Sequence, residues 1–295
     1  MRHTIKPYLF LLFGLLFLGL QSKKKQKPLH DISSFEQNFV AISDQLYVCK
    51  YETCNLDYMT FLYDVKYRMK PAIYQSLLPD TSNWLKPGTN NPPYQIYYLR
   101  HPAFAYYPLV NINYEQANFY LNWLSQKYNN DPKRPFKKVV FKLPTRKEWV
   151  KAAGVGVYKE GYPWGATLAD KPSKMLANYC SGEYIEKVWK DSVLNEFGVK
   201  VKAQDSVIVY AACHAKKDLY YTQEVNLKDA KQTENGLYHV GGNVSEMISS
   251  KGDCVGGNFL SNPEWMQLDA PNEFGPGYIA CPLVGFRVFM QVIEK

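Results

Sequence analysis

The stretch that decides the fold is Leu143-Pro144-Thr145-Arg146-Lys147-Glu148-Trp149. Phe141 to Leu143 has the pattern of a strand, and after it Thr145 and Glu148 have the spacing of a capping box that starts a helix. Trp149 would lie on the buried face of that helix, and Gly154 would end it. We therefore predict a short strand that leads directly into a short helix.

Two further helices are expected on the N-terminal side of this stretch. Asn113 can cap the longer one, and Gln116 completes its capping box. The buried stripe of this helix would be Ala117, Tyr120, Leu121, Leu124 and Tyr128. Residues 55–65 also have helical spacing, with Asn55 as the candidate N-cap, and they follow a strand-like alternation over residues 39–50.

The rest of the chain favours short strands and irregular structure. Residues 76–106 contain five prolines and are expected to form an ordered loop rather than regular helix. Beyond Gly165, the best strand candidates are Val207 to Tyr210 and Val284 to Phe289. The predicted class is α+β, with few helices, short strands and much irregular structure.

The N-terminal residues have the profile of a signal peptide. Basic residues precede an apolar segment from Tyr8 to Leu20, whose 13 residues are fewer than the about 20 that span a bilayer. We expect a signal peptide over residues 1–22, a tether over 23–38 and one domain over 39–295. The location is then periplasmic, outer-envelope or secreted, and an uncleaved anchor is the alternative, which would give membrane contact only through this segment.

Composition describes a folded protein without a nucleic-acid arm. The net charge of +8 is spread along the chain, and the runs at 23–25 and 133–138 lie in expected loops without a recognition helix. We therefore expect no nucleic-acid partner. The 24 tyrosines and six tryptophans either fill the core or form a ligand-binding face.

Eight short motifs follow one another in a characteristic order. They are KYETCN at 50–55, PLVNINYEQA at 108–117 with WLS at 123–125, LPTRKEW at 143–149, YPWG at 162–165, ANY at 177–179, NGLY at 235–238 with GNVSE at 242–246, GGNF at 256–259, and GFR at 285–287. In this order they resemble the formylglycine-generating-enzyme, or sulfatase-modifying-factor, family over about residues 39–290. The resemblance implies a variant of the C-type-lectin-like fold.

Active members of that family oxidise a substrate cysteine with two cysteines that bind copper just after the glycine pair. The corresponding positions here are Ser261 and Met266. A serine hydroxyl is a hard ligand and a thioether is a neutral, weak one, so neither replaces a thiolate for Cu(I). The resemblance therefore implies a pseudoenzyme without copper, the alternative being a rearranged thiol pair from Cys254 and Cys281.

The resemblance also implies structural calcium. The matching positions are Asn178, the carbonyl of Tyr179, Gly242, Val244 and Glu246. His239 stands where the family has Asp or Asn, and calcium prefers hard oxygen ligands. The alternative is that Asn178 and Glu246 brace loops through hydrogen bonds. The histidine pattern of the family's iron-dependent branch does not occur, because His3, His30, His101, His214 and His239 are isolated in the sequence.

Export would expose the cysteines to an oxidising compartment, where an even number favours disulfides. The candidates are Cys49, Cys54, Cys180, Cys213, Cys254 and Cys281, whose pairing the sequence leaves open.

Three functions compete. The first is a non-catalytic envelope protein that binds another protein or a glycan, as family members in gliding-motility and type IX secretion machinery do. The second is an oxidoreductase of the same family, either a formylglycine generator or another metal-dependent enzyme. The third is carbohydrate binding of the lectin type, in which exposed aromatic rings stack on sugars.

Overall fold

The computed structural model describes most of the chain from residue 35 onward. The described residues are 29, 31, 35–86, 91–154, 161–165, 169–171, 174–175, 177–179, 184–188, 193–194, 200–201, 207–211, 222–227, 230–275 and 280–295. The predicted signal peptide lies outside them. Among these residues, no helix is long and apolar enough to cross a membrane.

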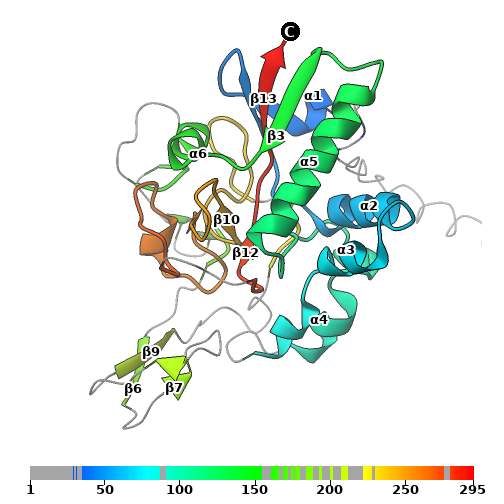
Figure 1. Ribbon diagram of the computed structural model, residues 1–295. Coiled ribbons are helices and arrows are strands. Elements are labelled where there is room, and N and C mark those ends of the chain that lie inside the picture. Colours follow the sequence, from blue (N-terminus) through cyan, green and yellow to red (C-terminus); the bar gives the residue numbers. More distant parts are fainter. Residues whose placement is uncertain are drawn as a thin grey trace, which may run out of the picture.

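The main sheet joins the two ends of the domain. Its four antiparallel strands have the order β1 (Phe39–Ala41), β2 (Leu46–Cys49), β13 (Phe289–Glu294) and β3 (Lys138–Lys142). In Figure 1, β13 runs beside β3 up to the C-terminus. Val48 of β2 lies opposite Phe289 of β13, so the first and last thirds of the chain share one ladder.

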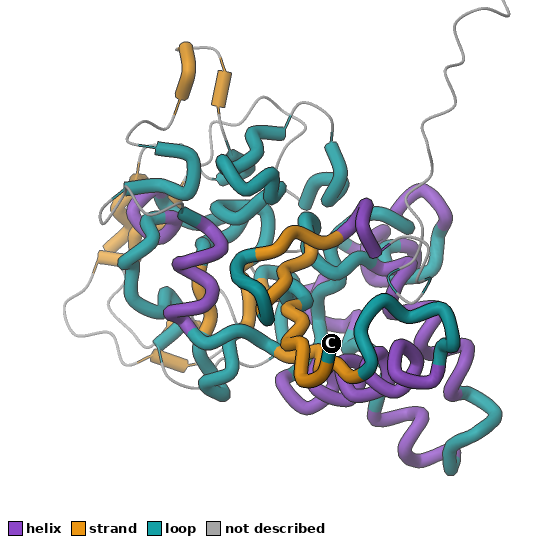
Figure 2. The backbone as a smooth tube through the Cα atoms, turned by 90° about the horizontal axis from the view of Figure 1, so that it is seen from above, coloured by secondary structure: helices purple, strands orange, loops and turns teal. Residues whose placement is uncertain are grey.

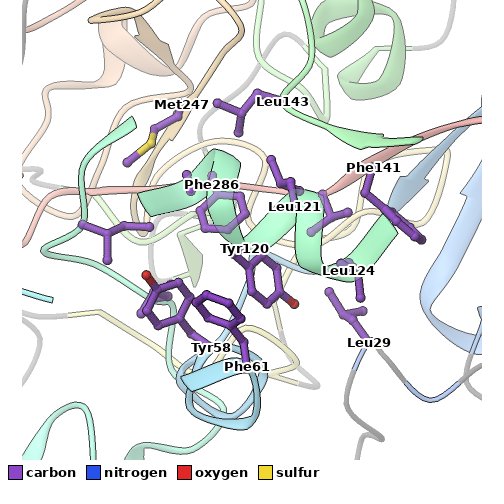
Figure 3. Close-up of a cluster of buried hydrophobic side chains, with 14 of the residues drawn as sticks. Leu29, Tyr58, Phe61, Tyr120, Leu121, Leu124, Phe141, Leu143, Met247 and Phe286 are labelled. Atoms are coloured by element: carbon purple, nitrogen blue, oxygen red, sulfur yellow. The ribbon is translucent and has the colours of Figure 1, made fainter. Parts of the chain in front are cut away.

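Two amphipathic helices form the main core against this sheet. Helix α5 (Tyr114–Asn130) begins at Asn113, whose side chain accepts from Gln116 N at 2.9 Å, and helix α2 (Asn55–Val65) packs beside it. Figure 3 shows the rings of Tyr58, Phe61 and Tyr120 grouped together, and Tyr120 also contacts the ring of Phe286. The expected cap and buried stripe of α5 are confirmed.

The N-cap of α2 differs from the expectation by one residue. Cys54, not Asn55, is the cap, and the carboxylate of Asp57 accepts from its backbone N–H at 3.3 Å. Asn55 instead donates from Nδ2 to the carbonyls of Tyr98 and Phe104. Its side chain therefore links α2 to the following layer.

The proline-rich region is more helical than expected. Residues 76–106 contain η2 (Thr81–Leu85), α4 (Pro92–Tyr97) and η3 (Pro102–Phe104), and α3 (Pro71–Ser76) leads into them. Proline starts α3, α4 and η3, because its missing N–H costs nothing in the first turn. The loop prediction was wrong because it treated every proline as a helix breaker.

The predicted strand and helix around Thr145 are confirmed. Helix α6 (Arg146–Ala153) follows β3, carries the Thr145 and Glu148 capping box, and has Gly154 as its C-cap. Figure 2 shows most helices gathered on one side of the molecule, while α6 lies on the other side among loops and strands.

A second sheet holds the region of the candidate site. Its order is β11 (Cys254–Val255), β10 (Ser245–Met247) and β12 (Val284–Gly285), with β12 parallel to β10. The short helix η4 (Pro263–Met266) follows β11. The single strand expected over 284–289 is therefore divided between two sheets, and the stretch 39–50 forms a hairpin rather than one strand.

The remaining described strands form two-stranded ribbons. They are β4 (Ala169–Lys171) with β5 (Lys174–Met175), β6 (Tyr184–Val188) with β9 (Val207–Ala211), and β7 (Val193–Leu194) with β8 (Lys200–Val201). The ribbons containing β6, β7 and β9 project from the main body in Figure 1. The short strands and few helices confirm the α+β class.

The folded part also extends in front of the expected domain start at Phe39. Leu29 is buried in the main core, its backbone N–H donates to Asp57 Oδ1 at 2.9 Å, and the short helix α1 (Phe35–Asn38) precedes β1. Part of the expected tether is thus packed against α2.

Candidate functional site

The candidate site is the loop that joins β11 to η4. Gly256 and Gly257 have φ of 90° and 66°. A Cβ on Gly256 would stand 2.6 Å from the carbonyl oxygen of Val240, so only glycine fits there. A Cβ on Gly257 would stand 3.3 Å from Ser261 Cβ and 3.0 Å from Met266 Cγ. Ser261 and Met266, the two positions that the resemblance aligns with the catalytic cysteines, are therefore neighbours around Gly257.

Ser261 is fully enclosed, with 0% of its surface exposed. Its Oγ accepts from the backbone N–H of Asn258 at 2.7 Å and donates to Glu273 Oε2 at 2.5 Å. The same carboxylate oxygen accepts from Asn258 Nδ2 at 3.0 Å. The hydroxyl is therefore a structural link that closes the loop.

Met266 is also 0% exposed. Its Cβ lies 3.4 Å from where a Cβ of Gly241 would stand, and the ring of Trp164 lies within 2.8 Å of the same point. Trp164 stacks on Tyr162 with a centroid distance of 5.8 Å, and both rings are half-buried. The thioether is therefore packed in the interior beside an aromatic pair.

These contacts do not suit copper. Cu(I) requires soft thiolate or similar ligands, whereas Ser261 offers a hydroxyl that is hydrogen-bonded to a carboxylate. Met266 alone supplies one neutral sulfur. The residues present at the two positions do not fit a copper ion.

The expected disulfides are not formed at three of the candidate cysteines. Cys49, Cys54 and Cys254 are buried free thiols, and Cys281 is buried in the same core cluster as Cys254. Cys180 and Cys213 lie outside the described residues. A free cysteine packs in a core like a small apolar residue, and these thiols have that role here.

Burial keeps these thiols protonated. It raises the pKa of Cys49 to about 12, and it raises the pKa of Cys54 well above its usual value, with the nearby Asp57 carboxylate adding to the effect. For Cys254, burial and then the neighbouring Cys281 raise the pKa in the same direction, and its Sγ donates to Asn272 Oδ1 at 3.3 Å. None of the three has the depressed pKa of a reactive thiolate.

A second cluster adjoins the glycine pair. Gly242 donates its N–H to the carbonyl of Gly256 at 2.8 Å, and Asn243 donates its N–H to the carbonyl of Asn178 at 2.8 Å. A Cβ on Gly242 would stand 2.4 Å from that Asn178 oxygen. The structure thus brings the two expected calcium segments into direct contact.

Asn243 is the centre of this cluster. Its Oδ1 accepts from the backbone N–H of Gln223 at 2.7 Å and from Asn178 Nδ2 at 3.2 Å. Its Nδ2 donates to Glu52 Oε2 at 2.6 Å, while Val244 N donates to Glu52 Oε1 at 3.3 Å. Burial raises the pKa of Glu52 well above its usual value, although Arg287 opposes the effect.

Glu246 forms a fully buried ion pair with Arg287. The guanidinium donates to Glu246 Oε1 from Nη2 at 2.6 Å and from Nε at 2.9 Å, and Trp149 Nε1 donates to Oε2 at 2.8 Å. Arg287 also donates to the carbonyls of Cys49, Lys50 and Tyr238. One side chain therefore connects β10 to two other segments, residues 49–50 and Tyr238.

This arrangement favours loop bracing over calcium at Glu246. Both carboxylate oxygens already accept N–H donors, and a cation would stand beside a guanidinium. The Glu246 carboxylate therefore does not fit a calcium ligand. Asn178 Nδ2 donates to Asn243, and the backbone N–H of Val244 donates to Glu52, so both residues brace neighbouring loops. The side chain of Tyr179 is buried.

His239 is buried, and its ring nitrogen contacts a backbone carbonyl. Its Nε2 contacts the carbonyl of Glu224 at 3.2 Å, and burial and the nearby Arg287 lower its pKa to about 4. His101 is an exposed residue whose Nδ1 accepts from Ala103 N. Within the described part of the chain, no group of three or more His, Cys, Asp or Glu side chains could hold a metal ion.

Three residues at the site were missed by the sequence reasoning. Glu52 and Arg287 belong to quoted motifs, but Glu52 pairs with Asn243 across 191 residues of sequence and Arg287 pairs with Glu246 across 41. Glu273 belongs to no motif, and only its contact with Ser261 gives it a role.

The fold is that of known proteins. PvdO from Pseudomonas aeruginosa superposes with a TM-score of 0.50 at 15% identity, covering 83% of this chain and 80% of that one. Treponema denticola variable protein 1 and CarF each give a TM-score of 0.48 at 16% identity, covering 83% and 87% of this chain and 84% and 93% of theirs. Comparison with curated proteins gives no match.

The class defined by fold and site is thus a formylglycine-generating-enzyme-like domain. The sequence model of the sulfatase-modifying factor enzyme 1-like domain matches residues 10–292. The chain belongs to this family.

Proposed function

We propose that this chain is a non-catalytic member of the family that acts as a binding or scaffold protein of the cell envelope. The observation that carries the proposal is that Ser261 and Met266, which the family resemblance aligns with the catalytic thiols, are buried in the interior. A hydroxyl bonded to Glu273 and a packed thioether supply neither copper ligands nor a nucleophile.

The signal-type N-terminal segment supports an exported location. The partner we propose is another envelope protein, such as a component of a secretion or gliding-type assembly, or a glycan. Hydrogen bonds through Asn243, Glu246 and Arg287 would then serve to hold the loops of a binding surface in place.

Copper loading tests the loss of chemistry. We expect the purified chain to bind no Cu(I) tightly and to consume no oxygen with a thiol peptide. The double variant Ser261→Cys/Met266→Cys should gain a Cu(I) site, because both positions border Gly257. The single variants are the matched controls, since one thiolate does not make a pair.

Oxygen consumption by the unmodified chain would overturn the non-catalytic role. An oxidoreductase would then be the better proposal, with Cys254 and Cys281 as its thiols, since both belong to one core cluster and Cys281 raises the pKa of Cys254. In that case activity should disappear in Cys254→Ser and persist in Cys49→Ser.

Affinity capture from envelope membranes tests the scaffold role. We expect the chain to retain a defined partner through high-salt washing. A purified chain that stays monomeric and recovers no stable partner would contradict the role, and binding on a glycan array would select the glycan instead.

A further inference from the structure

One surface of the helical side exposes aromatic and apolar side chains. We define the α2–α3 patch as Tyr63, Lys66, Tyr67, Lys70 and Ile73, which follow one another from the last turn of α2 into α3. Tyr63, Tyr67 and Ile73 are 76%, 80% and 42% exposed. Scattered exposed apolar residues are ordinary, but here they are grouped within eleven positions, and α3 has no buried residue.

The patch is cationic. Lys66 and Lys70 are exposed, and Lys66 Nζ lies 5.3 Å above the ring of Tyr67. The only acid between residues 63 and 79 is Asp64. Asp64 is bonded to Arg68 at 2.7 Å and to Lys127 at 3.0 Å, so its charge is already neutralised.

The N-terminal chain leads to the same region. Leu29 is fixed to the first turn of α2 by its hydrogen bond to Asp57. Only eight residues separate Leu29 from Leu20, where the apolar segment ends. An extended chain covers about 3.5 Å per residue, so these positions lie at most about 30 Å apart. Tyr67 is ten residues beyond Asp57, or about 15 Å along a helix.

We infer that the α2–α3 patch docks on an anionic lipid surface beside the N-terminal segment. Tyrosine rings are suited to the boundary between headgroups and acyl chains, and lysines are attracted to anionic lipids while their stems cover apolar surface. A membrane contact of the folded domain would thus come in addition to the contact that an uncleaved N-terminal segment gives. It goes beyond the proposed binding role and does not depend on the loss of catalysis.

A lipid surface explains the patch better than a protein groove does. The side chains are spread over a turn between two helices, and the tether length holds this face near any bilayer that contains residues 8–20. Excess positive charge matches phosphate headgroups directly.

Hydrogen exchange with the full chain tests the inference. The chain is reconstituted with vesicles of phosphatidylcholine containing phosphatidylglycerol and, separately, with phosphatidylcholine alone. We expect amides of residues 63–76 to exchange about tenfold more slowly with the anionic vesicles, because docking shields the short helix. High ionic strength should remove this protection.

Charge reversal supplies the matched control. Lys66→Glu/Lys70→Glu should abolish the protection, whereas Lys147→Glu/Lys151→Glu, an equally spaced and exposed pair on α6, should preserve it. Circular dichroism checks that both variants fold. The inference is overturned if the two vesicle types protect residues 63–76 equally, or if protection requires an added envelope protein.

Discussion

At the scale of the residue, burial decides the protonation of His239. The side chain is enclosed beside Arg287 and adopts φ of 50°, and its pKa falls to about 4. The ring is therefore neutral at neutral pH. The residue that stands where the family has Asp or Asn is thus a neutral, buried side chain whose Nε2 contacts the carbonyl of Glu224.

This depressed pKa gives stability a defined pH dependence. The unfolded histidine titrates near 6.5, so it binds a proton before the folded one as the pH falls. Stability should then decrease between pH 6.5 and 4 by about 3 kcal/mol from this group. Asparagine tolerates positive φ and does not titrate, so His239→Asn should remove this part of the loss.

Urea unfolding of both proteins at several pH values measures the effect. The difference in free energy of unfolding between wild type and variant should change across the window from pH 6.5 to 4. A difference that stays constant would contradict the assigned pKa.

At the scale of the element, helix starts are set by reciprocal caps. Thr145 Oγ1 accepts from Glu148 N at 3.2 Å, and Glu148 Oε2 accepts from Thr145 N at 2.8 Å. Asn113 and Gln116 make the same pair of bonds at α5. Each bond closes within three residues, which is why the sequence alone predicts these helices.

Removing the side chain of a cap residue should therefore lower the free energy of unfolding measurably. Thr145→Ala leaves the first-turn N–H of Glu148 without its acceptor and should lower the free energy of unfolding by about 1 kcal/mol. Thr60→Ala is the matched control, because Thr60 lies inside α2 and bonds only the carbonyl of Leu56. Denaturant unfolding of both variants should show a loss for Thr145→Ala alone, and equal losses would exclude the capping role.

At the scale of the whole molecule, Arg287 joins segments that are distant in the chain. Its guanidinium reaches Glu246 on β10 and the carbonyls of Cys49, Lys50 and Tyr238. The bonds to Glu246 and Cys49 are buried, and those to Lys50 and Tyr238 are partly buried. The charge pair therefore holds the two sheets and their loops in one arrangement.

Arg287→Met should destabilise the protein strongly. It leaves the carboxylate of Glu246 buried without a counter-charge, which typically costs about 3–5 kcal/mol. Arg68→Met breaks an ion pair whose arginine side chain is 65% exposed and should cost at most about 1 kcal/mol. Thermal and denaturant unfolding should separate the two variants clearly, and similar losses would show that the buried pair contributes little.

The sequence by itself determined the helices over 55–65, 114–130 and 146–153, and the family to which the chain belongs. The signals were local, since capping boxes and apolar stripes involve residues three or four apart. The helices that start at Pro71 and Pro92 were missed, because proline both breaks helices and starts them, and only the packing around it shows which.

Only the tertiary structure decided what the site can do. The pairing of β2 with β13 joins the two ends of the domain, and the contacts of Ser261 with Glu273 and of Glu246 with Arg287 join separate segments 12 and 41 residues apart. Such contacts depend on how every element packs, because a buried polar group must find its partner wherever the chain brings one. The sequence therefore identified Ser261, Met266 and Glu246 as candidate site residues, and the packing of the chain placed all three in the buried interior.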